Sequence, residues 1–402
     1  MGASPRGDRV CVVAALGDTV DSVRRRNLST VLDLVHHGDG PSRADLTALT
    51  GLNRSTIGAL VAELAELGLV EEAEPGATNR VGRPSRRVLP HPGPAVIAVN
   101  PEVDAITVGL VGLGARVHHR VRRELDGIPA PEEAARLVGE LVAELRAGPA
   151  RDRRLLGVGL AVPGLVRSSD GVVRWAPHLG WRDSSFAHLV ESEVGLPTVA
   201  DNDATLGALA EHLFGVGRGA LQLVYLNGGA SGIGGGVVVE GRPYRGALGY
   251  AGEFGHNRPR LDDPAHRATV GGTLEEEVSR ARLLELLGRR ASDEPELEAA
   301  LLAATDPALR SELARQQVVL AGALANAINV LGPELVVLGG FLAALLAWDA
   351  PGLEGAVAAR TLPTLWEGVR IRPAALGRDR LLIGAAELAL GEVLRDPASS
   401  AG

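Results

Sequence analysis

The chain has 402 residues and a formal net charge of −8, and 46% of its residues are apolar but only 3% aromatic. This length and apolar content predict two or three domains with aliphatic cores, and the negative charge excludes a protein that coats nucleic acid with its whole surface. A single cysteine, Cys11, excludes an intrachain disulfide framework and a cysteine-rich zinc site. We therefore expect a cytoplasmic protein.

Residues 1–20 are expected to form a flexible tail, and residues 21–92 a small first domain with its linker. Apolar residues between positions 28 and 35 recur at the spacing of one helix face. Ser42 followed three residues later by Asp45 is typical of a capping box, so a second helix is expected to begin there.

Leu46 and Leu49 of this second helix are expected to face a core. Gly51 suits a tight turn with positive φ, after which Asn53 caps a third helix. Three short helices with a glycine turn before the third predict a helix-turn-helix, whose last helix enters the major groove by its first residues. The candidate DNA-contacting residues there are Asn53, Arg54, Ser55 and Thr56.

Residues 69–90 have the pattern of a β-hairpin whose tip and second strand carry arginines without an intervening acid. Such a wing suits contacts with phosphates or with a narrow minor groove. The alternative to a DNA-binding domain is a helical dimerisation module whose arginine loop is simply exposed to solvent. Because helix-turn-helix and basic hairpin follow one another in order, we favour DNA binding. The wing candidates are Arg80, Arg83, Arg86 and Arg87.

Residues 93–402 alternate between expected strands and helices with glycine turns, which predicts an α/β fold. We expect a hairpin from strands at 95–100 and 105–117 and a helix at 131–147. Strands are expected at 155–164 and 196–203, and a helix at 204–214. Two strands joined by a glycine-rich turn should cover 221–244. The apolar stretch Val318–Trp348 is interrupted by polar residues, so it predicts a buried helix and a strand rather than a membrane span.

The stretch VADNDATLGALAEH, residues 199–212, ends an apolar strand in an Asp-Asn-Asp cluster. Asp203 precedes the expected helix, and the helix dipole is expected to keep its carboxylate ionised. The residue could be a general base or a group that only holds a ligand.

Several motifs in this half carry a family resemblance: GVGLAVPGLV, APHLGW, DNDATLGALAE, SGIGGGVV, GYAGEFGH and GGTLEEEVS, together with GRPS in the wing. By their order and spacing, the chain resembles the ROK family (repressors, open reading frames and sugar kinases), in its regulator branch. The resemblance implies an actin-like ATPase fold of two α/β lobes with a cleft between them. It also implies a sugar site, which carries over to Asn202, Asp203, Glu253, His256 and Glu275.

The chemistry of these five side chains fits a sugar, because carboxylates accept hydrogen bonds from adjacent hydroxyls and an amide both donates and accepts. Taken singly, each could be an ordinary cap, turn or surface charge. Two positions depart from the family pattern, since His178 and Thr205 stand where relatives often have asparagine.

The phosphate-binding turns of the family kinases are altered. The first turn reads VNPEVDA, where Asn100 replaces an aspartate, Pro101 lacks an N–H donor and Glu102 would repel a phosphate. The second turn retains glycines but has Ala230, Ser231 and Gly232 in place of Gly-Thr-Gly. We therefore expect no ATP cofactor and no enzyme activity. The alternative is an active sugar kinase with Asp203 as base and an appended DNA-binding domain.

The resemblance also implies a zinc site of one histidine and three cysteines, but the cysteine positions hold His266, Ala268 and Thr273. An alternative zinc site could be formed by His256, His266 and Asp262 or Asp263, yet we expect no bound metal.

Together these patterns predict a cytoplasmic transcriptional regulator of sugar-metabolism genes, and more specifically a repressor. Its expected partners are operator DNA, a small sugar effector and further copies of itself in a homodimer or homotetramer, without a membrane partner.

Overall fold

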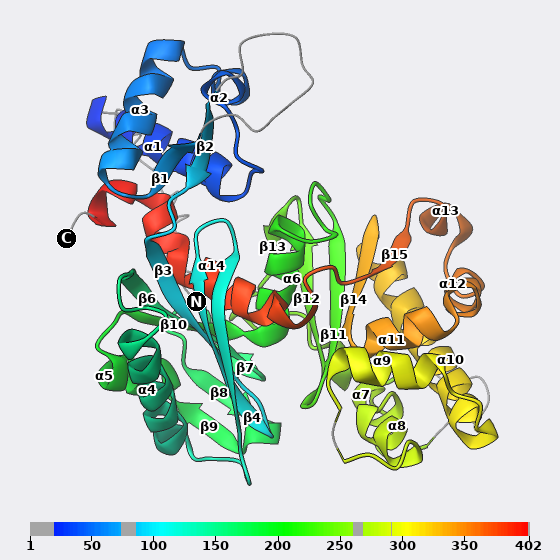
Figure 1. Cartoon of the computed structure of the whole chain (residues 1–402). Coiled ribbons are helices and arrows are strands. Elements are labelled where there is room, and N and C mark those ends of the chain that lie inside the picture. The colour runs from blue at the N-terminus through cyan, green and yellow to red at the C-terminus, as the bar shows by residue number, and fades with distance from the viewer. Residues whose placement is uncertain (1–19, 74–85, 260–267, 291, 401–402) are drawn as a thin grey trace, which may run out of the picture.

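The computed structural model describes residues 20–73, 86–259, 268–290 and 292–400 (Figure 1). A small N-terminal domain sits on one of two larger α/β lobes, as the blue elements at the top of Figure 1 show. It consists of α1 (Val20–His36), α2 (Arg43–Thr50), α3 (Arg54–Glu66) and an antiparallel pair, β1 (Val70–Ala73) and β2 (Arg87–Pro90). Of the expected tail, residues 1–20, all but Val20 lie outside the described residues, and Val20 is the first residue of α1.

The local signals of this domain are confirmed. Ser42 and Asp45 form the reciprocal capping box of α2, Gly51 has φ 71°, and the Asn53 side chain accepts a hydrogen bond from the Thr56 N–H. Leu46 is buried as expected, but the expectation for Leu49 is wrong, because this side chain is 65% exposed. Because α2 is short, only one of its side chains, that of Leu46, is buried in the core.

Each of the two lobes is built on a five-stranded sheet of the same design. In the first, β10, β6 and β3 run parallel and β4 and β5 continue antiparallel; in the second, β15, β14 and β11 are parallel and β12 and β13 continue antiparallel. A three-stranded sheet, β7-β8-β9, extends the first lobe. The bounds are β3 (Pro94–Pro101), β4 (Ala105–Gly112), β5 (Arg116–Glu124), β6 (Arg154–Val162), β7 (Leu165–Val166), β8 (Val173–Ala176), β9 (Trp181–Ser184), β10 (Thr198–Asn202), β11 (Leu223–Gly229), β12 (Gly232–Val239), β13 (Arg242–Pro243), β14 (Leu335–Gly340) and β15 (Arg370–Pro373).

The expected hairpin at 95–117 is wrong in extent, because β5 continues it into a three-stranded meander. As an edge strand, β5 has a mostly polar sequence, RVHHRVRRE. It therefore lacks the apolar pattern from which a strand is predicted. The other expected strands and helices are present. The remaining helices are α4 (Pro131–Ala147), α5 (Phe186–Val194), α6 (Asp203–Leu213), α7 (Leu274–Glu277), α8 (Arg280–Leu286), α9 (Glu294–Leu302), α10 (Pro307–Leu331), α11 (Phe341–Trp348), α12 (Ala350–Ala358), α13 (Pro363–Trp366) and α14 (Arg380–Arg395).

Two helices, α6 and α14, cross between the lobes. The helix α6 follows β10 of the first sheet but packs mainly on β11 and β12 of the second, whereas α14 follows β15 of the second sheet but packs mainly on β3 and β6 of the first. They touch each other directly, because a Cβ on Gly384 of α14 would collide with the carbonyl oxygen of Leu206 in α6. The two helices therefore form the junction about which the lobes meet.

The N-terminal domain is joined to this junction through the end of α1. Glu387 of α14 binds both histidines there, with 2.8 Å between its Oε2 and Nε2 of His36 and 3.0 Å between its Oε1 and Nε2 of His37. Nδ1 of His37 lies 3.1 Å from Oδ1 of Asp33. Burial lowers the pKa of His37, but hydrogen bonds and charges of Asp33 and Glu387 outweigh it and raise this pKa to about 9.

This raised pKa predicts the direction of a pH effect. The His37 imidazolium stabilises the folded chain fully below its unfolded pKa of 6.5, and the contribution is lost as the pH rises through about 9. We expect the melting temperature to fall between these pH values, measured by circular dichroism. In His37→Gln this part of the pH profile should flatten, and parallel profiles for the two proteins would contradict the assignment.

Within the described ranges, no single helix is long and apolar enough to cross a membrane. The pair α11 and α12 meets that criterion only when joined, and it is bent by 93°.

Candidate functional site

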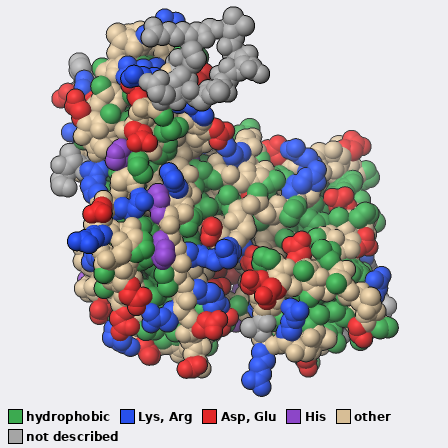
Figure 2. All heavy atoms as spheres, in the orientation of Figure 1, with side chains coloured by type: hydrophobic (Ala, Val, Ile, Leu, Met, Phe, Trp, Pro, Cys, Tyr) green, Lys and Arg blue, Asp and Glu red, His purple; other side chains and the backbone are tan. Residues whose placement is uncertain are grey.

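A cleft of about 350 Å³ lies between the lobes, which is within the range of sites for small molecules. Figure 2 shows acidic and arginine side chains around the hollow between the two lobes. All five residues expected to hold a sugar line this cleft: Asn202, Asp203, Glu253, His256 and Glu275.

Asp203 is the first residue of α6 and is placed there by its neighbour. The Asn202 side chain caps the helix by accepting a hydrogen bond from the Thr205 N–H at 2.9 Å, and its amide donates to the Gly164 carbonyl at 2.9 Å. Asn202 thus uses both ends of its side chain in the fold, although it lines the cleft. Oδ1 of Asp203 accepts from the Ala204 N–H at 2.7 Å.

The helix dipole is expected to keep Asp203 ionised, but burial of the side chain opposes its ionisation. Burial raises the pKa of Asp203 to about 6, and the hydrogen bond from Ala204 and the charge of Arg380 only partly offset it. The carboxylate is therefore ionised near neutral pH but titrates close to it.

Glu275, at the start of α7, is the centre of the opposite wall. Its Oε1 lies 3.7 Å from both His178 Nε2 and His256 Nδ1, and its Oε2 accepts from the Ile233 N–H at 3.3 Å. Burial raises the pKa of Glu275, but these donors outweigh it and hold this pKa below its usual value. Burial raises the pKa of Glu253, which lies 3.9 Å from His256. His178, noticed in the sequence only as a departure, therefore belongs to the site.

The part of the cleft formed by the two turns that bind phosphate in family kinases differs from a phosphate cradle. Glu102 lines the cleft there, and burial together with the neighbouring Asp104 raises its pKa to about 7. Asn100 donates to the Ala161 carbonyl at 2.9 Å. In the second turn, a Cβ on Gly232 would collide with Oε2 of Glu275, so this carboxylate of the sugar site lies against the turn.

Arg380 closes the same end from the first turn of α14. Its guanidinium is buried, pairs with both oxygens of Glu294 at 2.7 and 2.9 Å, and donates to Oδ1 of Asn227 at 2.9 Å. Burial lowers the pKa of Arg380, but Tyr225 and the ion pair with Glu294 outweigh it and raise this pKa. Sequence reasoning missed this residue, because nothing local to the helix shows that it meets Asn227 and Glu294, 153 and 86 residues away.

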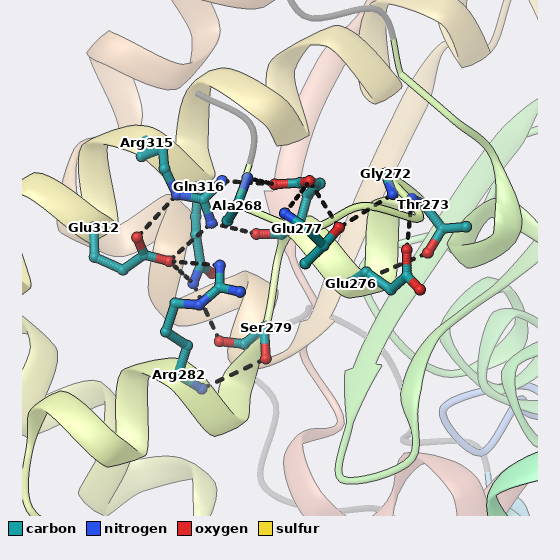
Figure 3. A network of polar contacts seen from close by, with 11 residues as sticks. Ala268, Gly272, Thr273, Glu276, Glu277, Ser279, Arg282, Glu312, Arg315 and Gln316 are labelled. Atoms are coloured by element: carbon teal, nitrogen blue, oxygen red, sulfur yellow. Dashed lines mark hydrogen bonds and ion pairs between the residues drawn. The ribbon is translucent and has the colours of Figure 1, made fainter. Parts of the chain in front are cut away.

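Glu277 holds the loop that precedes α7 (Figure 3). The side chain is 0% exposed, and its carboxylate accepts from the N–H groups of Ala268 and Thr269 and from the Thr269 hydroxyl, at 2.7 to 2.9 Å. Arg315 of α10 pairs with it at 3.0 Å and also with Glu312 at 2.8 Å. This network was missed too, because Glu277 and Arg315 stand 38 residues apart.

The donor set does not fit the zinc site of the family. Ala268 and Thr273 offer no metal ligand, and the Thr273 side chain instead caps α7. His266, Asp262 and Asp263 lie outside the described residues. Ala268, at one of the cysteine positions, is held through its backbone by Glu277.

Replacing Glu277 by leucine is expected to destabilise the protein by on the order of 3 kcal/mol, because Arg315, two backbone N–H groups and the Thr269 hydroxyl lose a buried acceptor. The measurement is thermal or denaturant unfolding. The matched control is Glu276→Leu, whose side chain is exposed and takes part in the capping box of α7 but not in the Glu277 network. This control should lose only about 1 kcal/mol. Equal stability of the two variants would show that the network does not brace the loop.

The residues expected to contact DNA differ in the contacts that they make within the protein. Oδ1 of Asn53 accepts from the Thr56 N–H and the Ser55 hydroxyl, so these groups cap α3. Arg54 is exposed and makes no ion pair within the described part of the chain. Arg87 donates to the Gly40 carbonyl at 2.8 Å and ties the wing to the loop after α1. Arg86 is exposed, whereas Arg80 and Arg83 lie outside the described residues.

The two lobes share one strand order and enclose a cleft, and a helix-turn-helix domain lies on the first lobe. These features define a DNA-binding protein built on an actin-like sugar-kinase fold. The model of the ROK family matches residues 96–392, and the chain belongs to this family. The model of the IclR helix-turn-helix domain matches residues 27–74.

Named relatives include both regulators and kinases. A xylose repressor of Bacillus spizizenii is 25% identical over 380 residues, which cover 92% of this chain and 97% of the relative. A glucokinase of Halalkalibacterium halodurans is 32% identical over 248 residues, 57% of this chain and 74% of the relative. A crystal structure of a ROK family transcriptional regulator, a homologue of the E. coli MLC protein, covers 93% of this chain and 97% of its own, with a TM-score of 0.71 and 23% identity. This last likeness shows the fold.

Proposed function

We propose that this protein is a transcriptional repressor of sugar-metabolism genes, and that a sugar bound in the cleft controls its binding to operator DNA. The observation that carries the proposal is the contrast between the two ends of the cleft. At one end, Asp203, Glu253, His256 and Glu275 surround a space that suits hydroxyl groups. The relatives named as xylose repressors support the same interpretation.

The other end of the cleft argues against phosphoryl transfer. Catalysis of that reaction depends on donors and cations that neutralise the phosphates. Here Glu102 supplies an acidic side chain in place of a donor or cation, and Arg380 is already paired with Glu294. We propose that the protein uses neither ATP nor a metal, and that Asp203 holds a sugar hydroxyl rather than removing its proton.

The kinase alternative draws support from the retained glycines of the second turn and from the glucokinases among the relatives. A coupled assay for ADP release with D-xylose, D-glucose and a wider sugar panel separates the two functions. We expect no turnover, and a melting temperature raised by at least one sugar. Robust turnover would overturn the proposal, and a panel without any thermal shift would show that the cleft no longer serves a sugar.

Symmetric operators suit symmetric proteins, so we propose a homodimer or homotetramer in the cytoplasm as the DNA-binding form. Light scattering on the purified chain measures this directly, and a monomer at working concentrations would contradict it.

A further inference from the structure

We propose that the His36–His37 pair at the end of α1 senses the relative position of the two lobes and so transmits the state of the cleft to the DNA-binding domain. The proposal rests on the proposed function and adds the residues through which the sugar acts.

The two helices that cross between the lobes both begin in the cleft. Asp203 is the first residue of α6, and Arg380 is the first residue of α14. Each helix follows the last parallel strand of one sheet and packs mainly on the other sheet. A change in the angle between the lobes therefore shifts α6 relative to α14.

Arg380 links this junction to the far lobe. Although α14 packs on the first lobe, the Arg380 guanidinium binds Asn227 of β11 and Glu294 of α9 in the second lobe. A ligand that moves the second lobe acts directly on this buried contact.

The two helices also come together beside the DNA-binding domain. Glu387 of α14 binds His36 and His37. Phe214, which follows α6, has its ring centroid 5.4 Å from that of His36 and 5.2 Å from that of His37. Arg218, a few residues later, donates to the His37 carbonyl at 2.9 Å. The histidine pair therefore contacts α14 and the end of α6 at once.

The contacts with α14 are the more extensive. The Ser29 hydroxyl donates to the Leu394 carbonyl at 2.7 Å, and Arg25 lies 3.7 Å from Asp396. The core of the N-terminal domain and the apolar face of α14 belong to one continuous hydrophobic cluster. The N-terminal domain thus sits on α14 (Figure 1), and Phe214 and Arg218 connect it to the end of α6.

The histidine cluster could be taken for a metal site, because His36, His37 and Glu387 hold three ligand atoms within 4.8 Å of one another. A metal-bound histidine usually donates its second ring N–H to an acceptor. Here Nδ1 of His36 accepts from the Gly114 N–H at 2.9 Å, so the ring proton lies on Nε2 and points to Glu387. The geometry fits a hydrogen-bonded contact rather than a metal.

Full-length Glu387→Gln tests the proposal, with Glu392→Gln as the matched control on the exposed side of the same helix. The operator is a duplex selected by the wild-type protein from a random pool, and the sugars are D-xylose and D-glucose. In the wild type and the control, we expect a sugar to change operator affinity by about 5- to 150-fold. In Glu387→Gln we expect sugar and DNA each still to bind, but the change to fall toward onefold. An undiminished change would overturn the proposal.

A second readout needs no sugar, because coupling between two sites is reciprocal. Hydrogen exchange is measured with and without the selected DNA over residues 253–257 and 376–382 of the cleft. We expect DNA to alter exchange there in the wild type but not in Glu387→Gln, and Phe214→Leu provides a second variant with a milder change. If no sugar acts on the wild type, the proposed function fails while this readout still decides the coupling. If DNA leaves hydrogen exchange in the cleft of the wild type unchanged, the proposed coupling is overturned.

Discussion

Asp203→Asn is expected to leave operator binding intact and to remove the response to sugar. The substitution keeps the shape of the side chain and the acceptor for the Ala204 N–H, but it removes the charge. Hydrogen bonds to a charged group contribute about 1.5 to 3 kcal/mol, so sugar affinity should fall about 10- to 150-fold. Isothermal titration with the sugar that stabilises the wild type measures the loss.

The pH dependence of sugar binding gives a second check. Because burial raises the pKa of Asp203 to about 6, sugar affinity of the wild type should fall as the pH drops below that value, where the carboxylate becomes protonated. The asparagine variant should lack this component. Asp152→Asn, in an exposed turn before β6, is the matched control. Normal sugar-dependent release from DNA in Asp203→Asn would contradict the role assigned to this residue.

Arg54→Ala is expected to weaken operator binding by about 1 to 3 kcal/mol and to leave sugar binding unchanged. Arg54 is the first residue of α3 and is exposed, while its neighbours Asn53 and Ser55 are engaged in the cap. It is therefore the side chain of this turn most free to reach a base edge or a phosphate.

The measurement is a titration of the selected operator at several salt concentrations. Loss of one phosphate contact would lower the salt slope by about one, whereas loss of a base contact would relax sequence preference. Arg136→Ala on α4 of the first lobe removes another exposed arginine, which lies outside the DNA-binding domain, and serves as control. Equal operator affinity of Arg54→Ala and the wild type would contradict the docking of α3.

The sequence predicted those parts of the molecule that depend on neighbouring residues. The capping box of α2, the glycine turn and the asparagine cap of α3 are interactions over two to four positions, and all are present. The five sugar-site residues came from motifs of the family, and the structure brings them to one cleft. Expectations failed at two places: Leu49 is exposed, and β5 is an additional strand.

Sequence alone determined that a winged helix-turn-helix precedes an α/β domain, because periodicity, caps and turns depend on local order. The two lobes and the altered phosphate turn were implied by the resemblance to the ROK family. Only the tertiary structure decided what surrounds the site. Arg380 meets Glu294, Glu277 meets Arg315, and Glu387 meets His36 across 351 residues, because charges buried by folding must find partners wherever the chain places them.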